Sequence, residues 1–212
     1  IGFLEAEGWK YSSGNNIHRV TKRDILIVDD FKKFIADTNP DLTEEEVTQI
    51  YDNVRLVGAE SDFATLHKVY GWMVNGVQFT PQDGLPRMIP LIDFDNLDKN
   101  IFRVVNQFTV EYTNNGQKEN RRPDVLLFVN GMPLCVIELK NPADANATIY
   151  DAWEQINIRY WRDIPHLLHY CPLACISDGV KTRLGTVRTP YEHFYAWRRV
   201  NDGDAVSTLP FE

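Results

Sequence analysis

The spacing of hydrophobic residues changes period near residue 91 of this chain. Before that point, apolar residues recur three and four positions apart in two segments, 43–54 and 62–74, as they do on one face of a helix. After it, apolar and polar residues alternate, which is typical of strands. The same signals predict further helices that end near Gly8 and cover 145–161 and 191–200, and strands at 102–110, 124–129, 134–139, 173–177 and 180–187.

Glycine, proline and asparagine mark where these predicted elements stop. Asn130-Gly131 joins two of the strands. This dipeptide is the strongest short signal for a β-hairpin, because it favours a turn whose twist matches that of the flanking strands. Residues 113–119 read as a polar turn around Asn115-Gly116. Residues 76–90 carry several prolines and glycines, which predict irregular structure.

The order of the elements predicts the fold class. Helices come first, then a strand meander, a helix, more strands and a last helix. This order indicates an α/β (α+β) architecture with a mixed central sheet flanked by helices. At 212 residues the chain is long enough for one well-buried core. We predict a single domain over 1–212, with an N-terminal helical part at 1–90 and a sheet–helix core at 91–200.

Composition and charge limit the possible functions. A hydrophobic fraction of 43% and a charged fraction of 25% are ordinary for a globular protein. No apolar run approaches the roughly 20 residues of a membrane span and no signal peptide opens the sequence, so we expect a cytoplasmic protein without a membrane partner. The net charge of −8 argues against a stand-alone nucleic-acid binder. It leaves a nuclease domain open, because acidic metal ligands add to the deficit and a partner can supply DNA affinity.

The cysteine and histidine residues predict no metal site. Three cysteines are too few, and odd in number, for a disulfide framework. The nearby residues His166, His169, Cys171 and Cys175 match no zinc-finger or zinc-ribbon spacing. We therefore assign them to the core and surface around the start of a strand.

The candidate chemistry lies between residues 121 and 141. This segment places Asp124, Glu138 and Lys140 around a hairpin of otherwise apolar strands. Charges there cost free energy unless they bind something, such as a divalent cation. Glu138 and Lys140 are two positions apart on a strand, so both side chains point to the same face. Two carboxylates for Mg²⁺ and a cation near the scissile phosphate are what metal-assisted phosphodiester hydrolysis needs.

Hairpin geometry sharpens this hypothesis. With a strict two-residue loop at Asn130-Gly131, Asp124 faces Ile137 and lies on the face opposite to Glu138. The site closes only if the hairpin carries one extra residue. We therefore predict either a type I turn with a bulge at Gly131 or a three-residue loop over 130–132. The alternative is a solvated strand face with a surface ion pair.

At these residues the sequence resembles a known nuclease family. Pro123-Asp124, thirteen intervening residues and Glu138-Leu139-Lys140 form the signature of the PD-(D/E)XK superfamily. More specific is the wider similarity to the N-terminal nuclease domain of the R subunit of type I restriction endonucleases. That similarity covers nearly the whole chain and includes NQF at 106–108, RRPDVLLFVNGMPLCVIELKNP at 121–142, ISDG at 176–179 and RLGT at 183–186.

The resemblance implies a fold and a role for each candidate residue. The expected fold is that of the PD-(D/E)XK restriction endonucleases. Asp124 and Glu138 match the metal-binding acids, and Lys140 matches the catalytic lysine. The carbonyl of Leu139 is a further expected ligand. The expected cofactor is Mg²⁺, for which Mn²⁺ substitutes, and the expected substrate is double-stranded DNA.

The family also tends to carry a glutamine and a tyrosine, four residues apart, on the helix after the hairpin. Tyr160 fits this pattern, but Gln155 precedes it by five residues. In an α-helix, five residues rotate two side chains about 140° apart, against about 40° for four. On that geometry the supporting pair does not share a face, and Gln155 as a polar surface residue is the alternative.

Two further assignments stay open. An acid on the first helix often completes such sites, and Glu5 and Glu60 are the candidates here. Arg121 and Arg122 sit at the start of the acid-bearing strand. Contact with a phosphate backbone and simple solvation are equally good interpretations of this pair.

The resemblance also implies partners. The rest of such an R subunit is an ATP-driven translocase, and no G-x4-G-K-[ST] phosphate loop occurs in these 212 residues. We expect a domain excised from a longer chain, which works with the translocase domains of that chain and with methylation and specificity subunits, so that ATP acts only through the motor. The alternatives are a repair nuclease of the same superfamily and a non-catalytic DNA-binding or docking module of the same fold.

Overall fold

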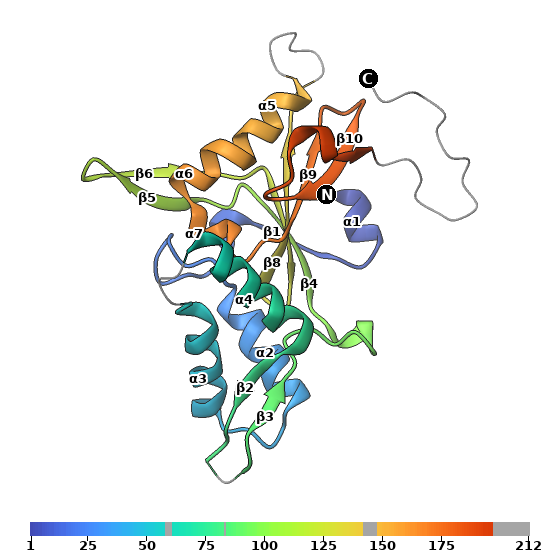
Figure 1. Ribbon diagram of the computed structural model, residues 1–212. Coiled ribbons are helices and arrows are strands. Elements are labelled where there is room, and N and C mark those ends of the chain that lie inside the picture. The colour runs from blue at the N-terminus through green and yellow to red at the C-terminus, as the bar shows by residue number, and fades with distance from the viewer. Residues whose placement is uncertain (58–60, 83, 142–147, 197–212) are drawn as a thin grey trace.

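A seven-stranded mixed sheet forms the centre of the molecule (Figure 1). The computed structural model describes residues 1–57, 61–82, 84–141 and 148–196. The sheet and its flanking helices confirm the predicted α+β class. In spatial order its strands are β1 (Lys10–Ser13), β4 (Phe102–Asn106), β7 (Val125–Val129), β8 (Met132–Leu139), β9 (Leu173–Ser177), β10 (Thr182–Thr186) and β11 (Tyr195–Ala196).

The strand directions decide where side chains can gather. β1 runs parallel to β4, β7 lies antiparallel between β4 and β8, and β9 runs parallel to β8. The carboxyl ends of β1, β4, β8 and β9 therefore meet at one end of the sheet, where β7 begins. β10 and β11 continue the sheet in antiparallel order.

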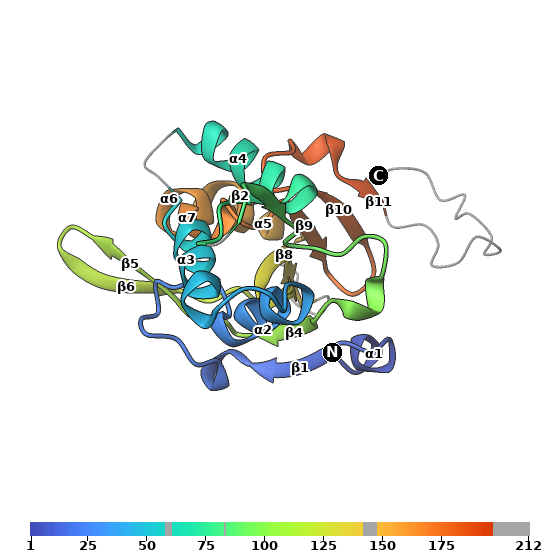
Figure 2. The same cartoon turned by 90° about the horizontal axis from the view of Figure 1, so that it is seen from below.

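Two small hairpins stand apart from this sheet. β2 (Val77–Phe79) pairs with β3 (Arg87–Ile89), and β5 (Val110–Asn114) pairs with β6 (Gln117–Arg121). The β5–β6 hairpin projects from the body of the molecule, and the chain returns from it to the start of β7 (Figures 1 and 2).

Helices from the N-terminal half of the chain and from the segment after β8 lie over the sheet (Figure 2). The segment after β8 contacts β8 and β9 through its first helix. Among the described residues, none of the helices has the length and apolar content that crossing a membrane requires. The helices are α1 (Gly2–Ala6), α2 (Val28–Thr38), α3 (Glu44–Arg55), α4 (Asp62–Asn75), α5 (Ile149–Glu154), the π-helix η3 (Gln155–Tyr160), α6 (Trp161–Asp163) and α7 (Pro165–Leu168), with 3-10 turns η1 (Gly14–Asn16), η2 (Leu97–Lys99) and η4 (Tyr191–His193).

Local sequence explains where two of the helices begin. Thr43 and Glu46 form a capping box at α3, in which each side chain accepts a hydrogen bond from the backbone of the other. Thr148 and Asp151 form the same motif at α5. The second box fixes the start of the helical segment that continues into η3.

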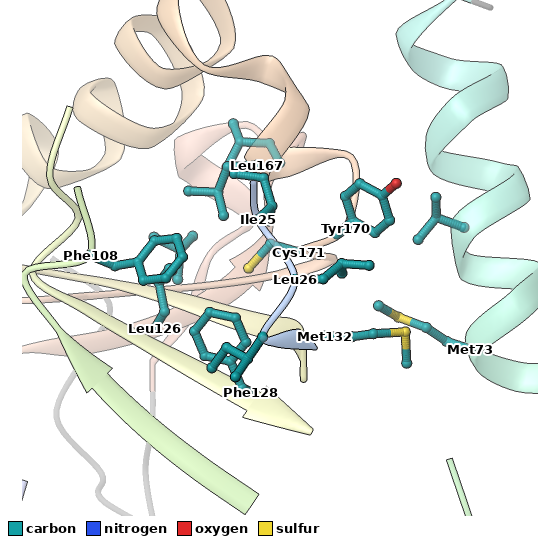
Figure 3. Packing of buried hydrophobic residues seen from close by; sticks show 14 of the residues in the cluster. Ile25, Leu26, Met73, Phe108, Leu126, Phe128, Met132, Leu167, Tyr170 and Cys171 are labelled. Carbon is teal, nitrogen blue, oxygen red and sulfur yellow. The ribbon is translucent and has the colours of Figure 1, made fainter. Parts of the chain in front are cut away.

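One hydrophobic core joins the N-terminal helices to the sheet (Figure 3). Phe108, which follows β4, packs against Phe128 of β7 with ring centroids 5.5 Å apart. Met73 of α4, Leu167 of α7 and Cys171 are buried in the same cluster. Each large apolar side chain buried in this way contributes roughly 1.5–3 kcal/mol to folding.

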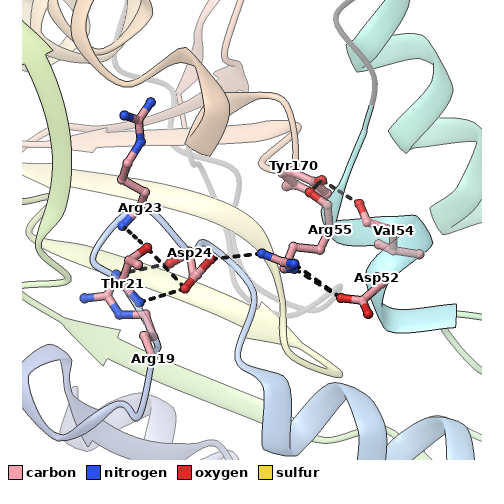
Figure 4. Close-up of polar contacts among 8 residues, drawn as sticks. All are labelled: Arg19, Thr21, Arg23, Asp24, Asp52, Val54, Arg55 and Tyr170. Atoms are coloured by element: carbon pink, nitrogen blue, oxygen red, sulfur yellow. Dashed lines mark hydrogen bonds and ion pairs between the residues drawn. The ribbon is translucent and has the colours of Figure 1, made fainter. Parts of the chain in front are cut away.

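Polar contacts tie α3 to the loop before α2 and to the segment after α7 (Figure 4). The Arg55 guanidinium lies 3.6 Å from the carboxylate of Asp24 and 3.3 Å from that of Asp52. The Tyr170 hydroxyl donates to the Val54 carbonyl at 2.6 Å. These contacts hold α3 against the core at its carboxyl end.

The structure corrects the predicted meander. The strand predicted at 102–110 is interrupted at Gln107, whose φ of 54° lies outside the extended region. The polar turn predicted at 113–119 is narrower, because β5 and β6 extend up to Asn115-Gly116. A non-glycine residue with positive φ has no strong local signal in the sequence, so the break was not predictable from periodicity.

The helix predicted at 191–200 is wrong where the structure describes it. Residues 191–193 form a 3-10 turn and Tyr195–Ala196 form β11, while 197–200 lie outside the described residues. Phe194 is buried in the core and β11 pairs with β10, so tertiary packing overrides the helical spacing of the aromatic residues. The helix predicted at 145–161 begins at Ile149, and 145–147 lie outside the described residues.

Candidate active site

A β-bulge in the β7–β8 hairpin decides which face Asp124 occupies. Asn130 and Gly131 form a two-residue turn, with φ angles of 51° and 77°. The pairing then shifts by one residue, and Leu134 is the extra residue of β8. The predicted odd residue is confirmed, but its predicted place, at Gly131 or in a three-residue loop, is wrong. Asn130 and Gly131 both tolerate positive φ, so the turn itself needs no extra residue. Pro133 has no backbone N–H to donate to the hydrogen bonds between β7 and β8, so the bulge forms beside Pro133.

Asp124 consequently lies opposite Glu138. The backbone N–H of Asp124 is 3.4 Å from Glu138 Oε1, and Asp124 Oδ2 accepts a hydrogen bond from the backbone N–H of Leu139 at 3.0 Å. The two carboxyl groups and the main chain of Leu139 therefore share one end of the sheet.

Glu138 is fully buried and is held only by neutral hydrogen-bond donors in the contacts we observe. The Tyr160 hydroxyl donates to its Oε1 at 2.6 Å, and the Gln155 amide donates to its Oε2 at 2.7 Å. Burial raises the pKa of Glu138 to about 8, which outweighs the lowering by the Tyr160 hydrogen bond, and the Asp124 carboxylate raises it further. An isolated buried carboxylate of this kind gains most from a nearby cation.

Lys140 reaches the same group of side chains through Gln155. Its ammonium donates to Gln155 Oε1 at 2.7 Å, while Gln155 Nε2 donates to Glu138. Gln155 Nε2 also lies 2.9 Å from the Tyr160 hydroxyl. The amide thus connects the lysine to the buried acid and holds both in place.

A π-helix explains how Gln155 and Tyr160 meet. The helix between them is wound as η3, in which a turn takes more residues than in an α-helix. Five residues therefore bring the two side chains back to nearly the same face, and both contact Glu138. The expectation that they diverge by about 140° is wrong, because it assumed α-helical geometry.

Gln107 is a site residue that the sequence analysis did not assign. Its backbone N–H donates to the Asp124 carbonyl at 3.0 Å, and its side-chain amide donates to Asp124 Oδ1 at 3.3 Å. The signal that marked it was its place in the NQF string, to which no chemistry had been attached.

The two arginines before Asp124 have different surroundings. The Arg121 guanidinium donates through Nε to Asp163 Oδ2 at 2.7 Å and also stacks over the Tyr112 ring, 5.5 Å from its centroid. Arg122 is exposed. Contact of either residue with a phosphate backbone stays a prediction, and the geometry makes Arg122 the more accessible of the two.

Glu5, one candidate for the expected upstream acid, does not lie at this end of the sheet. Glu5 lies on α1, which precedes β1, and β1 runs parallel to β4. α1 therefore lies toward the opposite end of the sheet from Asp124, which is bonded to Gln107 just after β4. Glu60, the other candidate, lies outside the described residues.

The oxygen atoms around Glu138 fit a hard divalent cation. The carboxylates of Asp124 and Glu138 and the carbonyl of Leu139 are the type of ligand that Mg²⁺ prefers, and Mg²⁺ usually keeps several waters in addition. In the part of the chain that the structure describes, no cluster of three or more His, Cys, Asp or Glu side chains is arranged to hold a metal.

Comparison with known proteins extends over nearly the whole chain. The model of the family described as type I restriction enzyme R protein N terminus matches residues 1–193. The putative type I restriction enzyme MjaIXP endonuclease subunit of Methanocaldococcus jannaschii is 34% identical over 97% of this chain and 20% of its own length. The type I restriction enzyme HindI endonuclease subunit of Haemophilus influenzae is 30% identical over 99% of this chain and 20% of its own length. The chain therefore spans about a fifth of the length of these relatives.

Proposed function

Because this chain belongs to the family of type I restriction enzyme R protein N-termini, we propose that it is the metal-dependent endonuclease domain of such an enzyme. Its reaction is the hydrolysis of phosphodiester bonds in double-stranded DNA, with Mg²⁺ as cofactor and Mn²⁺ as a substitute. The observation that carries this proposal is the bulge at Leu134, which puts Asp124 on the same face as Glu138 and Lys140.

Each residue of the group has a task in this proposal. Asp124, Glu138 and the carbonyl of Leu139 hold the metal ion. These residues would thereby form a site for an ion whose chemistry, when bound, would be to activate a water molecule and to offset charge on the phosphate. Lys140 places its ammonium beside the scissile phosphate, where it stabilises the negative charge that develops on the phosphate and on the attacking water as that water loses its proton.

Gln155 and Tyr160 support these groups rather than react. Burial and the neighbouring Glu138 raise the pKa of Tyr160, so its hydroxyl stays protonated and donates to Glu138. Gln155 keeps the Lys140 ammonium from swinging away by accepting its hydrogen bond. The two side chains thereby fix the rotamers of the acid and the lysine before substrate binds.

The proposed partners follow from the relatives. These are named endonuclease subunits of type I restriction enzymes, and each is about five times as long as this chain. We propose that translocase domains in the same polypeptide, together with methylation and specificity subunits in the cytoplasm, supply DNA recognition and ATP hydrolysis. The net charge of −8 supports this division, because an acidic domain gains little from neutralising phosphates by itself.

Crystals of this chain soaked in millimolar Mn²⁺ test the metal site. We expect anomalous density between the Asp124 and Glu138 carboxylates. Absence of the ion from that position, with the two side chains pointing apart, would remove the catalytic proposal in favour of a docking module of the same fold.

Lys140→Ala in the complete restriction enzyme tests the reaction. We expect DNA cleavage to be lost while ATP hydrolysis and translocation persist, because the lysine acts only at the scissile phosphate. Lys33→Ala, which removes a highly exposed lysine side chain, is the matched control and should change none of the three activities. Equal loss of all three in Lys140→Ala refutes the assignment.

A further inference from the structure

Gln107 has a backbone conformation that is unusual for its residue type. Among the described residues, three that are not glycine have positive φ, and they are Gln107, Asn115 and Asn130. The two asparagines each open an Asn-Gly hairpin turn, where such values are normal. Gln107 lies in no such turn, so its conformation is held by the structure around it and points to a local function.

The chain around Gln107 is built to hold it in this conformation. A Cβ on Gly14, at the end of β1, would lie only 2.5 Å from the Gln107 carbonyl oxygen, so glycine permits this close approach. On its other side, Phe108 is fully buried against Phe128. Position 107 is thus fixed between a tight backbone contact and a core anchor.

The result of this conformation is that Gln107 contacts Asp124 at two points. The backbone N–H of Gln107 donates to the Asp124 carbonyl at 3.0 Å, and its Nε2 donates to Asp124 Oδ1 at 3.3 Å. The other carboxylate oxygen, Oδ2, accepts from the backbone N–H of Leu139 at 3.0 Å. Both oxygens of the acid therefore have a donor, and the carboxylate plane is set from two strands.

We propose that Gln107 is a positioning residue, which orients the Asp124 carboxylate for the metal ion. The inference rests on the proposed function in one respect, that Asp124 is a metal ligand. The Gln107 amide occupies one lone pair of Oδ1 and the Leu139 N–H one of Oδ2, which leaves a further lone pair on each oxygen for a metal ion. This is the way in which neighbours of a ligand raise its affinity, by removing the freedom that it would otherwise lose on binding.

Replacement by glycine separates the amide from the backbone. Gln107→Gly removes the side chain but accommodates a φ of 54° without strain, so the variant should fold at least as well as the original chain. Gln107→Ala removes the same amide but keeps the strain, and should melt about 2–4 °C below the glycine variant. Asn115→Gly is the matched control, because it changes another positive-φ residue that is exposed at the tip of the β5–β6 hairpin.

Calorimetric titration of these chains with Mn²⁺ gives the decisive comparison. We expect Gln107→Gly and Gln107→Ala to bind Mn²⁺ about tenfold more weakly than the original chain, by the same amount in both, and Asn115→Gly to bind it unchanged. Undiminished affinity in Gln107→Gly overturns the positioning role, and so does a loss confined to Gln107→Ala, which would assign the effect to the backbone. If the original chain itself binds no Mn²⁺, the proposed function falls together with this inference, whereas the two preceding outcomes leave it intact.

Discussion

The helical segment from α5 to α6 serves two buried carboxylates in opposite ways. Near its middle, Gln155 and Tyr160 contact Glu138, which is fully buried and receives hydrogen bonds from neutral groups. At its end lies Asp163, which is 9% exposed. The Asp163 carboxylate forms ion pairs with Arg121, at 2.6 Å between Oδ2 and Nη2, and with Arg162, at 2.7 Å between Oδ1 and Nε. Both acids are buried, Asp163 less deeply than Glu138, and their electrostatic surroundings are opposite.

The pKa shifts follow this difference. The hydrogen bond from Arg162 and the ion pair with Arg121 lower the pKa of Asp163, whereas burial raises that of Glu138 to about 8. Asp163 is neutralised within the protein and anchors the β5–β6 hairpin to α6 through Arg121. Among the described residues, the Lys140 ammonium donates to an amide oxygen rather than to Glu138, and its charge offsets only part of the rise in the Glu138 pKa. The comparison separates a structural acid on α6, Asp163, from the β8 acid that we propose as a metal ligand, Glu138, and both are contacted by one helical segment.

Glu138→Gln tests the functional half of this comparison and has the largest expected effect. The amide keeps the size of the side chain but removes the charge that holds the metal. DNA cleavage by the complete enzyme should fall on the order of a thousandfold. In urea unfolding at pH 8, the metal-free chain should become more stable, because an uncompensated buried charge is gone. Normal cleavage by this variant would contradict the ligand role.

Asp163→Asn tests the structural half, and its effect on stability should have the opposite sign. The change leaves two guanidinium groups beside a buried site without their carboxylate. Because Arg162 is largely exposed, we expect a loss of about 3 kcal/mol in the free energy of unfolding, at the lower end for a broken buried pair. Urea denaturation at pH 7 measures it, with Lys33→Ala as a surface control that should change stability by less than about 0.5 kcal/mol. A stabilised Asp163→Asn would show that the two acids are alike.

The pH dependence of stability distinguishes the same two acids without changing their neighbours. For Glu138 the folded-state pKa of about 8 lies above its ordinary value of 4.5. Its protonated form is therefore favoured by folding, and stability should fall by about 1.4 kcal/mol per pH unit as pH rises from about 5 to 8. For Asp163 the pKa is lowered, so its contribution should be lost as pH falls below about 4.

Difference curves against the two variants isolate these contributions. Unfolding of the metal-free chain is measured from about pH 2 to pH 9, beside Glu138→Gln and Asp163→Asn. The glutamine variant should lack the decline between about pH 5 and pH 8, and the asparagine variant should retain it. A decline of equal slope in all three chains would assign the pH dependence to other groups.

Much of the fold and the position of the acids follow from local sequence. The capping box at Thr43 and the Asn130-Gly131 turn act over a few residues, so the helix and the hairpin that they define were predicted correctly. The need for an odd residue followed from the alternation of side chains along a strand. The location of the odd residue did not follow from the sequence. Both the Asn-Gly turn and the strand beside Pro133 could have held it, and the packing of the folded hairpin decides between them.

The features that were missed depend on contacts between distant segments. Asp163 is 42 residues from Arg121, and nothing near either residue announces the ion pair. Gln107 is held by Gly14, which follows β1, and by Asp124, which precedes β7. The sequence left Gln155 between a supporting role and that of a plain polar helix residue, because the five-residue spacing was measured on an α-helix and helix type depends on packing as well as sequence.

Deletion of Ile158 has the smallest expected effect. It tests whether the π-helix is needed only to bring Gln155 and Tyr160 to the same face beside Glu138. Ile158 is 49% exposed and lies between Gln155 and Tyr160. Without it the two side chains are four residues apart, which places them on one face of an α-helix. We expect the helix to become α-helical, stability to change by less than about 1 kcal/mol, and the chain to keep its Mn²⁺ affinity. Insertion of one alanine after Ile158 is the control, since it turns Tyr160 away from Glu138 while the arginine pairs of Asp163 can follow the helix end. If deletion abolishes Mn²⁺ binding as fully as insertion does, the site requires the π-helix itself and not just a shared face for the two residues.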